Sequence, residues 1–239
     1  PLWNPFIFAG MPAFASLSYH PGLYPASAVL RLLIDTFHLP PLTWLLFHYL
    51  WAALGLFAFL RWRGTSPWLA WLGGAFFILL PAQVAVGAYG HGSKVMTLSW
   101  IPWMLLFADR LMGRASEAND DARHPGWASL GLDTALLSAS VAGLLLAAHV
   151  QVAYYGLLTL GLFGIFRLGV LLRRGRKGLA ARALVAALLA LLLAGGASAL
   201  LYAPVQEYSH HSIRGLSQGG GADWRYATAW SLHPSEWKT

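Results

Sequence analysis

Long stretches without charge are the feature that most limits what this chain can fold into. Residues 128–172 carry two formal charges in forty-five positions, and 57% of the whole sequence is hydrophobic while 10% is charged. A soluble domain carries roughly a quarter of its residues as charges, so this composition excludes that class. The chain is also too apolar for a disordered tail, and it has no cysteine for a disulfide-stapled module. The sequence therefore predicts a polytopic membrane protein.

Several windows between charged positions are long enough to cross a membrane. Crossing a hydrocarbon core of about 30 Å takes roughly 20 helical residues. We predict an all-α bundle of about six transmembrane helices within 41–204, with extracytoplasmic loops, from windows at 41–60, 67–88, 95–112, the two halves of 128–172, and 183–202. Pro102 is expected to kink the third helix, and Gly195 and Gly196 are expected to let another helix approach the last one.

Basic residues fall unevenly on the two sides that these helices define. Eleven of the sixteen lie on one side, which the positive-inside rule predicts to be cytoplasmic: Arg61, Arg63, Arg110, Arg114, Arg123, Arg167, Arg173, Arg174, Arg176, Lys177 and Arg182. The other side holds seven of the nine histidines: His20, His38, His91, His149, His210, His211 and His233. The net charge of +7 therefore mainly reflects the orientation of the helices in the membrane, and no nucleic-acid partner is expected.

Irregular sequence lies mainly on the side predicted to be extracytoplasmic. Residues 1–40 are rich in proline, glycine and aromatic residues, and within them 26–37 has the amphipathic pattern of a helix lying in the membrane interface. Residues 205–239 are expected to begin a second extracytoplasmic loop. The chain starts at Pro1 without methionine and stops in a polar stretch, so we expect it to be a piece of a longer protein.

The clearest polar cluster on this outer side is residues 90–94, with the sequence Gly-His-Gly-Ser-Lys. Its two glycines permit backbone conformations that a side chain forbids, and Lys94 would place a point charge at the level of a lipid phosphate. The alternative is a tight turn with a lysine that snorkels to the membrane surface. No nucleotide-binding, hydrolase or cysteine metal motif is present in the sequence.

Two further polar clusters follow at outer helix ends. One contains His149, Gln151, Tyr154 and Tyr155. The alternative to a binding site here is an aromatic anchor at the membrane interface. The other runs from Glu207 to Arg214, where the arginine could bind a phosphate and the carboxylate could take a proton or hold a metal. A solvated loop is the alternative for this last cluster.

Other polar and aromatic residues within the windows are interpreted as structural. His48 is expected to form a hydrogen bond between helices rather than a proton relay, and Asp109, Arg110 and Asp133 near cytoplasmic helix ends are assigned no function. The tryptophans are expected to form interfacial belts, among them Trp3, Trp44, Trp51, Trp68, Trp71, Trp100 and Trp103.

Four stretches of the sequence resemble stretches of YfhO-like bacterial membrane proteins and follow one another in the same order as in that family. The resemblance covers essentially the whole chain. They are residues 1–12 with Tyr24 and Pro25, residues 90–94 leading into 100–102, residues 148–151 with Tyr154 and Tyr155, and residues 204–207 with 212–214. That family is grouped with the GT-C glycosyltransferases, which are polytopic helical enzymes. They transfer a sugar from a polyprenyl-phosphate carrier on the outer face of the bacterial membrane.

This resemblance implies a fragment of a membrane glycosyltransferase in the bacterial cytoplasmic membrane, acting on a cell-envelope acceptor. The acidic residue that GT-C enzymes place in the first outer loop would precede Pro1, and Asp35 lies in the wrong part of the loop to replace it. Lys94 and Arg214, with His91 beside them, would compensate the growing charge of the polyprenyl phosphate. The sugar pocket would be lined by His149, Gln151, Tyr154, Glu207, Trp3 and Tyr24. No cofactor is assigned, and the resemblance leaves open whether the site binds a divalent metal ion.

Two other classes of protein stay open. A transporter or flippase for lipid-linked sugars should have charges or broken helices near the middle of the membrane, where only His48 and Pro102 come near. A non-catalytic scaffold subunit would need only the helices and the aromatic belt. An acidic residue in the loop before Pro1 would favour the enzyme over both.

Overall fold

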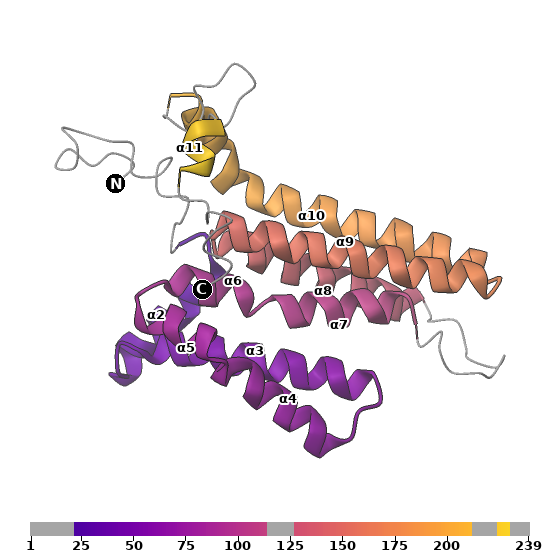
Figure 1. Cartoon of the computed structure of the whole chain (residues 1–239), viewed down its shortest axis with the longest axis horizontal. Coiled ribbons are helices and arrows are strands. Elements are labelled where there is room, and N and C mark those ends of the chain that lie inside the picture. Colours follow the sequence, from indigo (N-terminus) through magenta and orange to yellow (C-terminus); the bar gives the residue numbers. More distant parts are fainter. Residues whose placement is uncertain (1–21, 114–126, 212–223, 230–239) are drawn as a thin grey trace, which may run out of the picture. The chain divides into compact units, whose positions relative to one another are not determined.

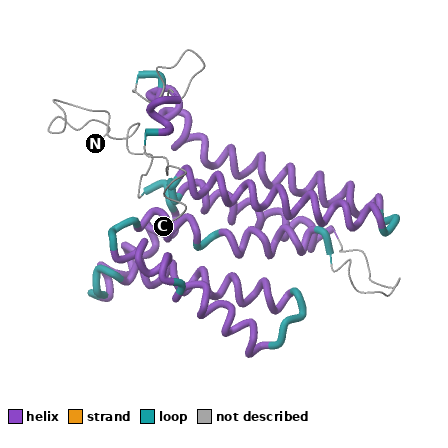
Figure 2. Tube along the Cα trace, viewed as in Figure 1, coloured by secondary structure: helices purple, strands orange, loops and turns teal. Residues whose placement is uncertain are grey.

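A computed structural model describes residues 22–113, 127–211 and 224–229, which contain helices, turns and loops and no strand (Figures 1 and 2). The all-α prediction is confirmed. The helices are α2 (Pro25–Phe37), α3 (Thr43–Trp62), α4 (Pro67–Leu79), α5 (Pro81–Ala88), α6 (Gly92–Leu98), α7 (Ile101–Leu111), α8 (Trp127–Leu146), α9 (Val150–Arg173), α10 (Lys177–Ser209) and α11 (Trp224–Thr228).

The chain divides into two compact units. The larger unit is Tyr19–Ala199 and holds α2 to α9 with most of α10. The smaller unit combines Pro1–Ser18 with Leu200–Thr239, and its described parts are the last turns of α10 and the short helix α11. Asp109 and Lys94 both lie in the larger unit.

Three helices, α3, α9 and α10, are long and apolar enough to cross a membrane by themselves. α4 and α5 form a fourth crossing if they are counted together, with a bend of 44° between them. The apolar part of α8, Leu130–Leu146, is shorter, and the third window is divided between α6 and α7. Each of the six predicted windows therefore contains helix, and three to four crossings meet the requirements of length and composition among the described residues.

Proline determines where two of these windows break. Pro81 begins α5 directly after the bend, and Pro102 is the second residue of α7. A proline has no N–H to donate to the carbonyl four residues earlier, and its ring collides with that carbonyl. The kink expected at Pro102 is thus a complete break between two helices. Pro204, in contrast, lies inside α10, which continues to Ser209 beyond the loop boundary predicted at residue 205.

α7 lies at the centre of the larger unit and packs against α3, α8 and α9. Its buried Met104, Phe107 and Leu111 belong to one apolar core with residues of α8, α9 and α10. α10 contributes only alanines to this core: Ala186, Ala190 and Ala194. α10 therefore meets this core through small side chains.

Glycine makes a second close approach, between α3 and α4. A Cβ on Gly74 would lie 2.7 Å from the carbonyl oxygen of Ala53, so only glycine fits this contact. The prediction for Gly195 and Gly196 was wrong, because a Cβ on either would meet no atom within 4 Å in the described part of the chain. The contact of α10 with the apolar core is made by its alanines.

A buried ion cluster joins the ends of α3 and α7 to α9. The carboxylate of Asp109 is fully buried and lies 2.6 Å from Nε of Arg167 and 3.1 Å from Nη1 of Arg63. Arg167 is 4% exposed, and its Nη2 also donates to the carbonyl oxygen of Gly113 at 2.9 Å. Burying one charge is costly, but pairing it with hydrogen-bonded partners offsets most of that cost.

A second ion pair extends this cluster to α8. Nη2 of Arg110 lies 2.8 Å from Asp133, and its guanidinium also covers the ring of Trp62 at 5.5 Å. Asp109, Arg110 and Asp133 were expected to have no function, and their ion pairs connect α3, α7, α8 and α9.

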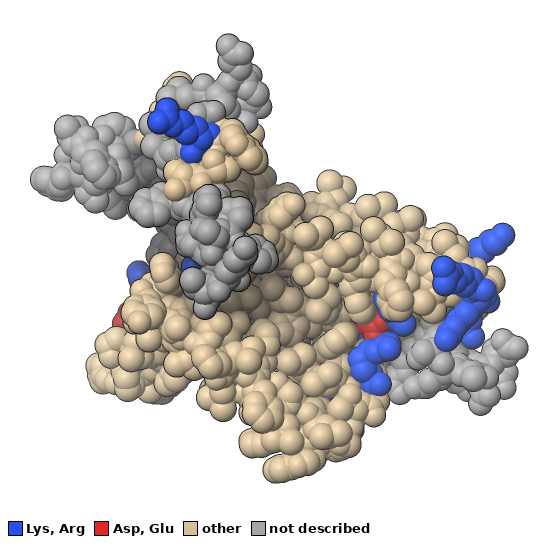
Figure 3. All heavy atoms as spheres, viewed as in Figure 1, with Lys and Arg blue, Asp and Glu red and all other residues tan. Residues whose placement is uncertain are grey.

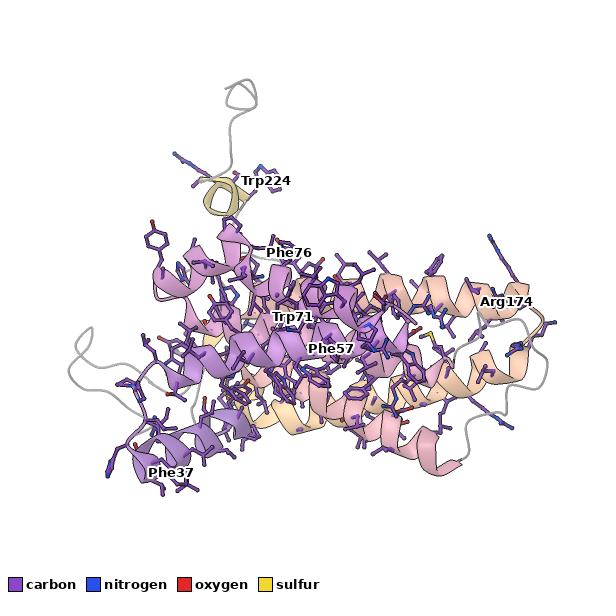
Figure 4. All side chains as sticks on the ribbon, turned by 90° about the horizontal axis from the view of Figure 1, so that it is seen from below. Phe37, Phe57, Trp71, Phe76, Arg174 and Trp224 are labelled. Carbon is purple, nitrogen blue, oxygen red and sulfur yellow. The ribbon has the colours of Figure 1, made fainter. Side chains whose placement is uncertain are left out.

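Most lysines and arginines of the larger unit gather at one end, as the sequence predicts (Figure 3). This basic end contains the ion cluster and the turn between α9 and α10, where Figure 4 places Arg174. Arg114 and Arg123, which were predicted for the same side, lie outside the described residues. The helix predicted at 26–37 is confirmed as α2, whose Val29, Leu32 and Phe37 are exposed.

Replacing Asp109 with asparagine tests the ion cluster. The variant leaves Arg167 buried without a counter-charge, and we expect the free energy of unfolding to fall by about 3–5 kcal/mol. Denaturant or SDS titration of the intact protein measures this loss. Asp35→Asn, on the exposed surface of α2, is the control and should change stability by less than about 0.5 kcal/mol. Equal stability of the two variants would contradict the role given to the cluster.

Candidate functional site

The loop between α5 and α6 holds the first predicted cluster, at the end of the larger unit where α3 begins. Gly90 has φ +77°, a conformation that side chains rarely adopt, and His91 is the N-cap of α6. A Cβ on Gly92 would collide with the ring of Trp44 from α3. The first glycine is therefore required by the backbone, as predicted, and the second by a close aromatic neighbour. Together they fix the start of the helix that carries Lys94.

The turn between α8 and α9 brings His149 to the same place. Its backbone N–H donates to Oγ1 of Thr97, a fully buried residue of α6, at 3.3 Å. Its ring Nδ1 accepts from the amide of Val152 at 3.3 Å and so caps α9. Ala148, just before it, has φ +63°. This pair of hydrogen bonds holds the imidazole beside α6.

Lys94, His91 and His149 form a basic cluster, which we call the Lys94 cluster. Partial burial lowers the pKa of His149, and the positive charges of Lys94 and His91 lower it further. Among the described residues, no aspartate or glutamate forms an ion pair with any of the three. The cluster therefore places the charge of Lys94 next to apolar helices and beside two imidazoles, and a bound anion would compensate that charge.

The other predicted site residues on α9 are exposed. Nε2 of Gln151 donates to the hydroxyl of Tyr155 at 3.3 Å, and the rings of Tyr154 and Tyr155 meet edge to face at 5.6 Å. These side chains occupy the first turns of the helix that His149 caps. Their position fits both a pocket wall and an interfacial anchor.

Three predicted site residues lie outside the described part of the larger unit. Glu207 is exposed on the last turns of α10, within the smaller unit. Trp3 and Arg214 lie outside the described residues. Within the residues that the structure describes, no group of three or more histidine, aspartate or glutamate side chains could hold a metal ion.

Tyr24 is part of a buried hydrogen-bond chain. Nε1 of Trp100 donates to the Tyr24 hydroxyl at 2.8 Å, and that hydroxyl lies 2.9 Å from Nε2 of His48. Nδ1 of His48 lies 2.6 Å from the carbonyl oxygen of Trp44, so Nδ1 carries the proton and Nε2 accepts from tyrosine. The hydrogen bond expected of His48 is present, and its side-chain partner is the residue that precedes α2.

The contacts of Tyr24 and of the neighbouring tryptophans correct two expectations. The proposed stacking of Tyr24 on a sugar does not fit the arrangement, because its side chain is fully buried and its ring stacks on His48. The belt interpretation is wrong for Trp51, Trp100 and Trp103, which pack on one another between α3 and α7. The rings of Trp51 and Trp103 are stacked at 4.5 Å, and Nε1 of Trp103 donates to the Trp51 carbonyl oxygen. Trp68 and Trp71 on α4 are exposed, as a belt requires.

Comparisons with protein-family models, curated proteins and solved structures give no match to this chain. The functional interpretation therefore depends on the residues of the site and on the sequence resemblance.

The electrostatics of the Lys94 cluster can be measured through His149. Its NMR titration should have a midpoint below 6.5, and Lys94→Gln should move the midpoint upward by removing a positive charge. Because the folded state disfavours the protonated ring, this group reduces stability as the pH falls below 6.5 and has no effect well above it. Lys177→Gln, at the basic end, should leave the midpoint unchanged. If Lys94→Gln leaves the midpoint of His149 unchanged, the charge of Lys94 does not act on His149 and the two side chains do not form one cluster.

Tyr24→Phe tests the buried chain. The variant leaves the indole N–H of Trp100 and Nε2 of His48 without the hydroxyl, and we expect a loss of about 1–3 kcal/mol for such buried polar groups. Tyr89→Phe is the matched control, since Tyr89 is 81% exposed. Equal unfolding temperatures of the two variants would show that the hydrogen bonds of Tyr24 do not hold α2 to α3.

Proposed function

We propose that this chain is part of a membrane glycosyltransferase, and that the Lys94 cluster binds the phosphate of a polyprenyl-phosphate-linked sugar. In this proposal the basic end faces the bacterial cytoplasm, and the Lys94 cluster faces the extracytoplasmic side. The acceptor is a cell-envelope glycan or polymer. The resemblance to YfhO-like proteins supplies the reaction class.

The single observation that supports this proposal most is the juxtaposition of Lys94, His91 and His149 at the end of an apolar helical bundle. An ammonium and two imidazoles can donate several hydrogen bonds to a phosphate oxygen. The apolar surfaces of α3, α9 and α10 are suited to the hydrocarbon part of the same ligand. A ligand with one anionic group and one long apolar chain satisfies both features.

The proposed chemistry needs charge compensation more than it needs a nucleophile from the protein. When the acceptor hydroxyl attacks the anomeric carbon, the bond to the polyprenyl phosphate breaks and its oxygen gains negative charge. Lys94 would stabilise that charge as it develops, and His91 or His149 could donate a further hydrogen bond. The proposed chemistry also requires a carboxylate that deprotonates the acceptor hydroxyl.

A transfer assay on the intact protein in proteoliposomes tests this proposal. Charge-assisted hydrogen bonds contribute about 1.5–3 kcal/mol, so Lys94→Ala should lower kcat/KM for the polyprenyl-phosphate donor by about ten- to hundredfold. Arg61→Ala is the control, because Arg61 is exposed at the basic end and donates only to the nearby Thr65 carbonyl among the contacts described. Transfer by Lys94→Ala at the control rate would remove Lys94 from the site. A wild-type protein that transfers no sugar would favour the scaffold or the transporter.

A further inference from the structure

An apolar groove runs between α8 and α10, away from the Lys94 cluster. Its volume is about 590 Å³, and its walls are apolar apart from Thr134 and Arg182. α8 contributes Gly131, Thr134 and Ala135, and α10 contributes Ala181, Val185 and Leu189. The groove lies within the larger unit, and the function proposed above makes no use of it.

Basic residues stand at one end of this groove. Four of the five residues from Arg173 to Lys177 are basic, and the sequence has no acidic residue between positions 151 and 206. Gly175, with φ +72°, forms the tight turn that places them between two apolar helices. Lys177 is four residues before Ala181, so the two lie on the same face of α10. The basic residues of the turn and the apolar groove therefore follow one another along the same face of α10.

The length of the groove matches one leaflet of a bilayer. Its α10 wall extends from Ala181 to Leu193. Twelve helical steps of about 1.5 Å cover about 18 Å, which is close to half of a hydrocarbon core of about 30 Å. The groove thus begins beside the basic turn and ends near the middle of the membrane, as an acyl chain does.

We propose that this groove binds one anionic phospholipid from the leaflet that borders the turn between α9 and α10. One acyl chain lies against α8 and α10, and the headgroup phosphate lies beside Arg176 and Lys177. The surplus of positive charge selects an anionic headgroup, because basic residues near a membrane surface attract anionic lipids. A lipid that binds the folded protein in this way stabilises the contact of α10 with the bundle.

Native mass spectrometry of the intact protein tests this proposal, after release from nanodiscs that contain equal amounts of dioleoyl-phosphatidylglycerol and dioleoyl-phosphatidylcholine. We expect one retained phosphatidylglycerol per chain and at least fivefold enrichment over phosphatidylcholine. Arg176→Gln combined with Lys177→Gln should abolish this preference, and Arg61→Gln should leave it intact. Millimolar glycerol phosphate should not displace the lipid, because the headgroup alone lacks the chain that fills the groove.

A second variant pair tests the groove itself. Gly131→Phe places a ring in the groove and should lower lipid retention at least fivefold. Gly161→Phe on α9 is the matched control, since a Cβ on either glycine meets no atom within 4 Å. Ala135→Phe replaces the first variant if that protein does not fold. Equal retention of the two lipids by the wild type, or equal lipid retention by the groove-filling variant and Gly161→Phe, would overturn the proposal.

Discussion

A carboxylate buried between two guanidinium groups sets the arrangement of helices at the basic end of this protein. Asp109 of α7 pairs with Arg63 after α3 and with Arg167 of α9, and it retains no contact with solvent. In an apolar bundle, packing alone discriminates weakly between alternative helix neighbours. A buried charge discriminates strongly, because any arrangement that separates it from its partners leaves an uncompensated ion. The central position of α7 between α3, α8 and α9 follows from this constraint together with the apolar core.

The opposite end of the larger unit uses neutral hydrogen bonds instead. Trp100, Tyr24 and His48 form a chain that ends on a backbone carbonyl, and His149 connects the turn before α9 to Thr97 of α6. These contacts position the Lys94 cluster without using its charges. Positive charge at this site is therefore available to a ligand, whereas the arginines of the ion cluster are occupied by carboxylates. This difference is the physical reason for placing function at one end and structural support at the other.

Sequence patterns predicted the helices well because those patterns are local. Apolar windows located every long helix that the structure describes, and 26–37 was recognised as a helix from its amphipathic pattern alone. The resemblance placed Lys94 and His149 in one substrate site, but the hydrogen bond from residue 149 to residue 97 that holds His149 beside α6 was not predicted. The role of Asp109 was missed for the same reason, since Arg167 is far away in sequence. The signal that could have revealed it was the presence of charged residues inside otherwise apolar windows, which require partners.

The proposed function requires that the Lys94 cluster and the basic turn lie on opposite sides of a membrane. The chain has no cysteine, so single cysteines can be introduced at Tyr89, beside the cluster, and at Arg174, in the turn. Intact bacterial cells that express each variant are treated with a membrane-impermeant maleimide before and after permeabilisation. Cysteine at position 89 should react in intact cells, and cysteine at position 174 should react only after permeabilisation. Reaction of both positions from the outside, or the reverse order, would contradict the account.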